Sequence, residues 1–445
     1  MRGSININDS MENFYPMMIK IKNFRNTFSD KGCITLFNSK LKITLGLILL
    51  VGMFTSCENV NPELGLKQGI WRGQVSTQGN DIPFNFDVKK EDGAYQIQLI
   101  NGLEKLDIDD IDILEDSLFF DMHIFDISVK AKIYNDSLVG TYTKNYAENY
   151  VLPFKAFHGK KGRFDNINSS NIFDGSWETI FKTREGKETS AIGIFKKEGE
   201  TLRGTFLSKT GDYRYLDGYS VKDTMYLYTF DGNHIYKFRA YKENDSILKG
   251  EYWSGKTSYK TFVSVKNDTV ALPDPNSLTY LKDGYDKVDF SFPDLDGNLL
   301  SPQDEKYKDK VLILQILGTW CPNCMDETRF LSDWYNKNQS NGVEIIGLAY
   351  EIKPEFEYAR ERVLSMKEKL NVPYDFVIAG TSSTKSASES LPMLNKVMSF
   401  PTSIIIDRTG KVRRIHTGFS GPATGTHYEE FVDDFNQFMK DLIDE

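Results

Sequence analysis

The chain has 445 residues, of which 40% are hydrophobic and 26% are charged, a composition typical of folded domains and not of wholesale disorder. This length predicts two or three domains. The net charge of −9 argues against a basic surface that follows nucleic-acid phosphates, and the four cysteines exclude a disulfide-dense scaffold.

The first feature along the chain is an apolar run, residues 43–54 (ITLGLILLVGMF), which follows Lys40 and Lys42. Its twelve residues suit the core of a signal peptide better than a membrane-spanning helix, which needs about 20. Small residues directly before Cys57 resemble a bacterial lipoprotein signal, in which that cysteine carries lipid. We therefore expect a leader over residues 1–56 and a lipidated tether over 57–68 that holds the chain on a membrane outside the cytoplasm. The alternative is a buried core helix.

Residues 69–270 form a β-rich region that repeats itself. Short alternating segments such as residues 84–88 and 124–133 predict strands between turns. The markers GIW, DSLFF and NDSL-x-GTY recur as GSW, DTMYL and NDSI-x-x-GEY, at offsets of 106, 107 and 109 residues. We therefore predict a duplicated module, 69–165 and 166–270, each an antiparallel meander of about seven or eight strands. Two small barrels or sandwiches, or halves of one barrel, fit this pattern.

The tryptophans and the acidic residues of this region are interpreted as structural and not as parts of a functional site. Trp71 and Trp177, in the first repeated marker, are expected to fill the ends of apolar cores. The acidic run at residues 107–112 alternates with isoleucine and is interpreted as one strand with a solvated face.

A Pro-containing linker over 271–284 precedes a segment, 285–445, in which strands alternate with helices. Strands are expected at residues 311–317, 343–350, 376–378, 402–406 and 412–416, with an extra strand at 288–292. Helices are expected at residues 322–337, 354–370, 391–397 and 428–443. The polar stretch 381–389 is expected to be a surface loop. The predicted fold class is thus an all-β duplicated meander followed by an α/β domain.

The chemically informative motif is Trp320-Cys321-Pro322-Asn323-Cys324, where a buried strand ends and a helix begins. At the helix N-cap the sulfur of Cys321 lies near unpaired backbone N–H groups and the positive end of the helix dipole, which favours the thiolate. Pro322 suits the first helical position. Cys324 lies one turn deeper and is expected to be the shielded partner. Once a leader is removed and Cys57 is lipidated, these are the two remaining thiols.

This segment resembles the TlpA/ResA group of thioredoxin-fold proteins in the AhpC/TSA–Redoxin superfamily. The matching pieces are residues 290–297, 310–313, 318–324, 399–402 and 406–410. The resemblance implies a thioredoxin fold without a cofactor and membrane-tethered thiol–disulfide exchange in the periplasm or cell envelope. It also implies a membrane electron donor of the DsbD/CcdA type and a link to cytochrome c maturation.

The resemblance carries over to individual residues. Pro401 matches the family's cis-proline, which packs across from the cysteine pair and leaves Phe400 backbone groups free for an extended substrate. Glu327 matches the acid that ResA-like members place beside the cysteines, and a partly buried carboxyl there could move the proton of Cys324. The bland alternative for Glu327 is an acid that stabilises the helix dipole. Trp320 is expected to shape the rim.

The sequence thus predicts a lipid-anchored thiol–disulfide oxidoreductase that acts as a reductant of protein disulfides and forms a reversible Cys321–Cys324 disulfide. Its partners would be protein thiols and disulfides, with no nucleic acid and no metal. A zinc ribbon needs a second cysteine pair, and a peroxidase or a copper chaperone needs other cysteine motifs. The alternative is a surface lipoprotein whose β repeats bind a ligand while the thioredoxin-like domain is a redox switch.

Overall fold

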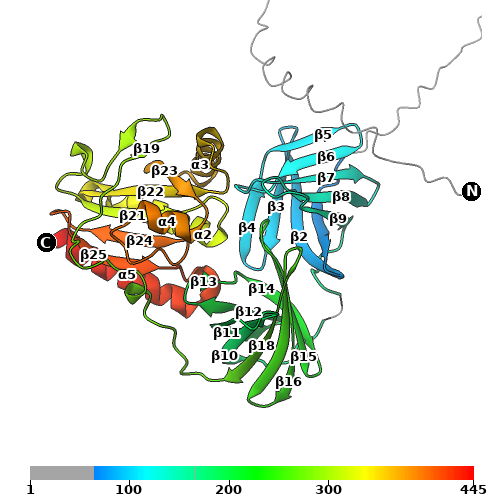
Figure 1. Ribbon diagram of the computed structural model, residues 1–445. Coiled ribbons are helices and arrows are strands. Elements are labelled where there is room, and N and C mark those ends of the chain that lie inside the picture. The colour runs from blue at the N-terminus through cyan, green and yellow to red at the C-terminus, as the bar shows by residue number, and fades with distance from the viewer. Residues whose placement is uncertain (1–64, 166) are drawn as a thin grey trace, which may run out of the picture. The chain divides into compact units, whose positions relative to one another are not determined.

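The structure is a computed structural model that describes residues 65–165 and 167–445. The proposed leader and the lipidation residue Cys57 lie outside the described residues. No helix in the described part of the chain has the length and apolar content needed to cross a bilayer. Figure 1 shows the two β-rich modules and the mixed α/β domain that follow one another along the chain.

The first β module is a single antiparallel sheet with the strand order β4-β3-β2-β1-β9-β8-β7-β6-β5. Its strands are β1 (Gly69–Thr77), β2 (Asn80–Glu91), β3 (Ala94–Asn101), β4 (Glu104–Ile108), β5 (Ile111–Leu114), β6 (Ser117–Asp121), β7 (Ile127–Ile133), β8 (Ser137–Lys144) and β9 (Val151–His158). The sheet ends at β4 and β5, which do not pair with each other. Alternate side chains point into one apolar core, as the period of two in the sequence predicts.

The second β module closes on itself. Its strands are β10 (Gly175–Thr183), β11 (Glu188–Glu198), β12 (Thr201–Ser208), β13 (Gly211–Asp212), β14 (Leu216–Val221), β15 (Thr224–Phe230), β16 (Ile235–Asn244), β17 (Ile247–Ser254) and β18 (Ser258–Lys266). The order is β11-β10-β18-β17-β16-β15-β14-β12-β13, and β12 also pairs with β11. The repeats are therefore two separate sheets, one open and one closed into a barrel. Each has nine strands, so the expectation of seven or eight is too low.

The two modules place their repeated tryptophans in the same way. Trp71 and Trp177 are both fully buried, and each indole N–H donates to the backbone carbonyl four residues earlier, at 2.9 and 2.8 Å. Gly69 and Gly175 precede them with φ of +101° and +113°, a backbone conformation that favours glycine. The interpretation of both tryptophans as core residues is confirmed.

The C-terminal domain is built on a five-stranded sheet with the order β23-β22-β21-β24-β25. Its strands are β21 (Val311–Leu317), β22 (Val343–Glu351), β23 (Asp375–Thr381), β24 (Thr402–Ile406) and β25 (Val412–Thr417), and its helices are α2 (Pro322–Asn338), α3 (Phe356–Leu370), α4 (Thr384–Ser390) and α5 (Thr426–Asp444). Strands β21, β22 and β23 are mutually parallel, whereas β24 runs antiparallel to both of its neighbours, β21 and β25. This confirms the predicted α/β fold class.

The central strand β21 is buried on both faces and separates two apolar cores. Ile313 packs in one core with side chains from α2, α3 and α5. Leu314 packs in the other core with Ala387 of α4 and with Val288 and Phe290 from the segment before the sheet. A continuous apolar strand is therefore required here, because neither face meets water.

Three local predictions are wrong. The helix expected at residues 391–397 is absent, and α4 instead occupies most of the stretch predicted to be a loop. Ser383 caps α4 by accepting from the Ser386 N–H at 2.9 Å, and a single buried residue, Ala387, holds the helix on the sheet. The extra strand at 288–292 is reduced to β19 (Phe292–Pro293), which pairs with β20 (Leu299–Leu300).

The acidic run is also not one strand, because β4 ends at Ile108 and β5 begins at Ile111. Asp109 and Asp110 lie in the connection between β4 and β5. Each carboxylate forms an ion pair with Lys369 of α3, at 2.9 and 3.0 Å. These acids therefore link the first β module to the C-terminal domain.

Candidate active site

The cysteine pair lies where the central strand passes into α2. Cys321 is the N-cap residue, and its Sγ accepts a hydrogen bond from the Cys324 backbone N–H at 3.2 Å. Pro322 occupies the first helical position, where its missing N–H costs nothing. Both cysteines are free thiols in this structure. The predicted N-cap geometry is confirmed.

The two sulfurs have different surroundings. The Cys321 residue is 7% exposed, whereas Cys324 is completely buried. Burial raises the pKa of Cys324 well above its usual value, and the neighbouring Cys321 raises it further. Cys324 therefore keeps its proton, while the Cys321 sulfur accepts the Cys324 backbone N–H at the positive end of the helix. This asymmetry fits an attacking thiol and a shielded partner.

The loop before β24 forms the opposite side of the site. The Phe400–Pro401 peptide bond is cis, as predicted. The Cys321 Sγ lies 3.7 Å from the Phe400 carbonyl oxygen. The Trp320 ring packs almost perpendicular to the Phe400 ring, with 5.5 Å between ring centroids. The structure thus brings together both cysteines with Trp320, Phe400 and Pro401, although these residues come from distant parts of the chain.

Glu327 lies on the second turn of α2, inside the domain. It accepts hydrogen bonds from Gln315 Nε2 at 2.9 Å and from Ser403 Oγ at 2.8 Å. Burial raises the pKa of Glu327 to about 7, although both hydrogen bonds oppose this rise. The carboxyl is more deeply buried than the sequence predicts. A carboxyl with this pKa can release and take up a proton near neutral pH.

A second buried acid, Glu351, was not predicted. It is the last residue of β22 and accepts hydrogen bonds from the Thr319 backbone N–H and hydroxyl, both at 2.8 Å. Burial raises the pKa of Glu351 to about 7. The neighbouring Tyr350 carbonyl accepts the Trp320 indole N–H at 2.9 Å. The sequence does contain a signal for Glu351. The residue ends β22, which is parallel to the strand before Cys321, and the carboxyl ends of parallel strands meet at the same edge of a sheet.

The β modules also reach the cysteine motif, which nothing in the sequence indicates. Asn233, between β15 and β16, donates from Nδ2 to the Trp320 carbonyl at 2.7 Å. Arg214, between β13 and β14, is fully buried and forms ion pairs with Asp326 of α2 and Glu104 of β4. The surroundings of α2 therefore include both β modules.

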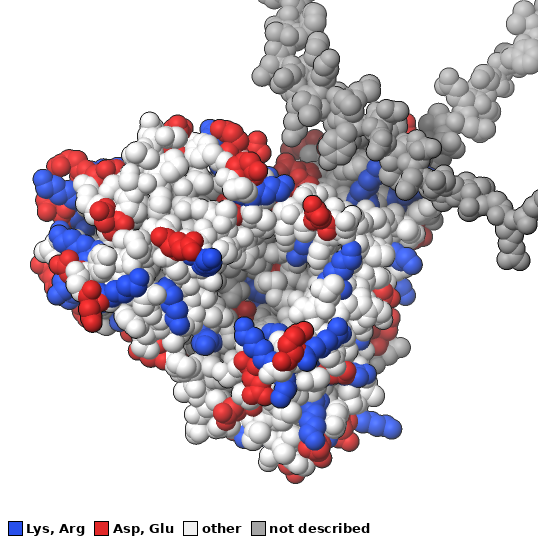
Figure 2. All heavy atoms as spheres, viewed as in Figure 1, with Lys and Arg blue, Asp and Glu red and all other residues white. Residues whose placement is uncertain are grey.

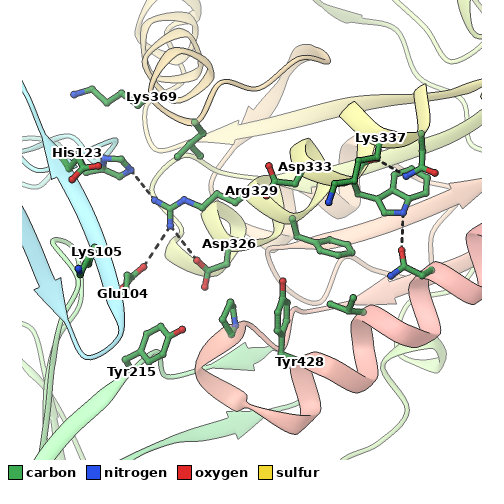
Figure 3. Close-up of a pocket in the computed structure, with 18 of the residues that line it drawn as sticks. Glu104, Lys105, His123, Tyr215, Asp326, Arg329, Asp333, Lys337, Lys369 and Tyr428 are labelled. Carbon is green, nitrogen blue, oxygen red and sulfur yellow. Dashed lines mark hydrogen bonds and ion pairs between the residues drawn. The ribbon is translucent and has the colours of Figure 1, made fainter. Parts of the chain in front are cut away.

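A cleft of about 930 Å³ lies beside this network, lined by the first β module, α2 and α5. Figure 3 shows Arg329 reaching toward His123, Glu104 and Asp326, at 3.2, 3.8 and 3.6 Å. Figure 2 shows basic and acidic side chains interspersed over the visible face of the molecule. The described residues include no cluster of three or more His, Cys, Asp or Glu side chains placed to hold a metal ion.

Comparison with known proteins finds likeness in the C-terminal domain. The Redoxin family model matches residues 284–430. The thiol-disulfide oxidoreductase ResA of Geobacillus thermodenitrificans is 29% identical over 130 residues, which are 29% of this chain and 66% of that protein. ResA of Bacillus subtilis is 24% identical over 160 residues, 36% of this chain and 77% of that protein. The chain thus spans about two thirds to three quarters of these relatives.

Solved structures of thiol-disulfide oxidoreductases each cover about a third of this chain. A thiol-disulfide oxidoreductase from Bacteroides fragilis is 24% identical and covers 33% of this chain and 99% of its own, with a TM-score of 0.24. A thiol:disulfide interchange protein of the thioredoxin family from Chlorobium tepidum is 21% identical and covers 36% of this chain and 99% of its own, with a TM-score of 0.27.

Proposed function

We propose that the C-terminal domain, which is TlpA/ResA-like and thioredoxin-fold, is a thiol-disulfide oxidoreductase that reduces protein disulfides outside the cytoplasm from a lipid anchor at Cys57. One observation supports the redox role above all others. The Cys321 sulfur lies at the N-cap of α2, faces the Phe400 carbonyl and has a fully buried second thiol behind it.

The proposed reaction proceeds by two thiol–disulfide exchanges. The Cys321 thiolate attacks one sulfur of the substrate disulfide, the substrate S–S bond breaks, and the other substrate sulfur leaves and takes up a proton. Cys324 then loses its proton and attacks Cys321. The Cys321–Cys324 disulfide forms and the second substrate thiol leaves. Two electrons pass to the substrate, so a dithiol electron donor, proposed to be a membrane protein of the DsbD/CcdA type, must reduce the pair again.

Glu327 is proposed to accept the proton of Cys324 in the second exchange. The raised pKa of Cys324 makes this thiol a poor nucleophile until its proton is removed. Glu327 lies one turn further along α2, and its pKa of about 7 lets a fraction of the carboxyl be ionised at neutral pH. Glu351 is proposed to position the turn before Cys321 through its two hydrogen bonds to Thr319.

Substrate binding is proposed to use the rim formed by Trp320, Phe400 and Pro401. The Trp320 and Phe400 rings are both partly exposed and flank the attacking sulfur. An extended segment carrying the substrate cysteine could pack its apolar side chains on these rings. Support for the anchor comes from the apolar run at residues 43–54 and from Cys57, which lie outside the described residues.

The test compares two cysteine variants with the wild-type chain in a disulfide-reduction assay. Cys321→Ser should abolish turnover because the attacking sulfur is lost. Cys324→Ser should instead accumulate a mixed disulfide with the substrate, seen on a non-reducing gel, because the resolving thiol is missing. Retained turnover in Cys321→Ser would rule out the assignment.

A second measurement decides the direction of electron flow. Equilibration with glutathione buffers gives the reduction potential of the cysteine pair. A value below roughly −230 mV supports a reductant, whereas a value near about −120 mV would make the protein an oxidant.

A further inference from the structure

Three residues of the second β module cover the first turn of α2, and the exchange chemistry above gives them no role. Asp212 ends β13, Arg214 lies between β13 and β14, and Asn233 lies between β15 and β16. These three residues are called the clamp. They lie far from the cysteine motif in the sequence, yet all three contact it or the residues next to it.

Asn233 contacts the residue directly before Cys321. Its Nδ2 donates to the Trp320 carbonyl at 2.7 Å, and its Oδ1 accepts from Lys144 Nζ at 2.6 Å and from the Tyr146 hydroxyl at 3.1 Å. Because the oxygen of the amide already serves two donors from the first β module, the nitrogen must face Trp320. The orientation of this amide is thus set by both β modules.

The segment around β13 packs on the two residues between the cysteines. Asn323 Nδ2 donates to the Asp212 carbonyl at 3.2 Å, and Arg214 lies 3.4 Å from the Pro322 carbonyl. A Cβ placed on Gly211, whose φ is +132°, would lie 2.3 Å from Asn323 Nδ2. The backbone of the second β module at Gly211 therefore lies so close to Asn323 that no side chain fits between them.

Charge pairing holds this contact in place. The Arg214 guanidinium is fully buried and pairs with Asp326 of the C-terminal domain, with Glu104 of the first β module, and with Asp231 of its own module at 3.5 Å. Separating the modules would leave these charges unpaired, which is strongly unfavourable away from water. Arg214 thus joins all three parts of the chain beside α2.

The clamp limits what can reach the attacking sulfur. Cys321 is 7% exposed and Asn323 is 8% exposed, and Pro322 is also buried, although these residues begin a helix directly after the end of β21. A stable contact between folded proteins buries about 800 Å² on each partner. The covered side of the motif cannot supply such a surface, whereas Trp320 and Phe400 remain partly exposed.

We propose that Asn233 and Arg214 are positioning residues that set substrate specificity: they hold the β modules over the cysteine motif, so that small disulfides and extended cysteine-containing segments are admitted and folded protein disulfides are hindered. This inference rests on the proposed function. It gives the β modules a defined task, which is to form one wall of the redox site.

The test uses the full chain and two substrates of different size, hydroxyethyl disulfide and insulin. Asn233→Ala removes the contact with Trp320. Asn233→Asp keeps the acceptor for Lys144 and Tyr146 but cannot donate to the Trp320 carbonyl. It is therefore the variant that removes fewer contacts of this side chain. The ratio of insulin to hydroxyethyl disulfide turnover should rise about fivefold in both, as expected for the loss of one hydrogen bond, through a lower KM for insulin.

The matched control is Lys369→Ala, which breaks another link between a β module and the C-terminal domain, away from the motif. The ratio should not change in this variant. A ratio that stays constant in both Asn233 variants, or rises equally in Lys369→Ala, overturns the inference.

A chemical readout separates this inference from the proposed function. Alkylation of Cys321 by iodoacetamide and by a maleimide on a protein-sized polyethylene glycol needs no catalysis. The Asn233 variants should speed the bulky reagent and leave the small reagent unchanged, and equal acceleration of both reagents would refute the clamp. If wild type and Cys321→Ser reduce neither disulfide, the proposed function fails whatever the alkylation result.

Discussion

Neutralising Glu327 should change how the stability of the thioredoxin-fold domain depends on pH. The pKa of this carboxyl rises from its ordinary value of 4.5 to about 7 on folding because the group is buried. Between these two values the folded state holds a proton that the unfolded state has lost, so stability falls as pH rises. Each pKa unit is worth about 1.4 kcal/mol, which makes the loss about 3 kcal/mol between pH 4.5 and 7.

The variant Glu327→Gln removes this loss. A glutamine has the shape and hydrogen-bonding capacity of the protonated acid, so it should keep the contacts with Gln315 and Ser403 that the acid makes at low pH. Wild type and variant should therefore have similar stability near pH 4.5, and the variant should be more stable by about 3 kcal/mol above pH 7. The gain would come with slower resolution of the mixed disulfide.

The measurement is hydrogen exchange of α2 backbone amides between pH 4.5 and 8, which reports the free energy of opening of this helix. Asp333→Asn, at an exposed carboxylate on the same helix, is the matched control for loss of one negative charge. If the wild-type chain and Glu327→Gln show the same pH dependence, the carboxyl does not hold a proton in the folded domain, and its assignment as proton acceptor fails.

Three further predictions concern the β modules. Arg214→Met should lower the free energy of unfolding by about 3–5 kcal/mol, because it leaves buried carboxylates without a cation; an unchanged thermal midpoint would contradict the charge-pairing argument. Gly211→Ala places a Cβ against Asn323 and should raise the rate at which the polyethylene glycol maleimide alkylates Cys321, and a rate equal to wild type would show that the contact is not tight. Trp177→Phe should destabilise the closed barrel by about 1–3 kcal/mol in urea unfolding, since the Phe173 carbonyl loses its partner and the core loses volume.

Local chemistry made part of this protein predictable from its sequence. Proline is favoured at the first helical position, so Pro322 directly after an apolar strand indicates a helix N-cap at Cys321 and places Cys324 one turn deeper, as the structure shows. The repeated Gly-x-Trp markers likewise predicted a large core side chain at one strand start in each module, and the structure adds the positive φ of the glycine. The helix at 384–390 was missed because one serine cap and one buried alanine form too weak a periodic signal.

Tertiary structure alone decided which distant groups surround the cysteines. Sequence order cannot show that Asn233 meets the Trp320 carbonyl or that Arg214 pairs with carboxylates from three parts of the chain, because no local pattern distinguishes a solvated arginine from a buried one. The pKa of Glu327 depends in the same way on removal from water by strands and helices that the sequence places far away. The local sequence around Cys321 thus specifies the redox chemistry. The packing of the β modules on the C-terminal domain specifies, in our proposal, which substrates can reach that sulfur.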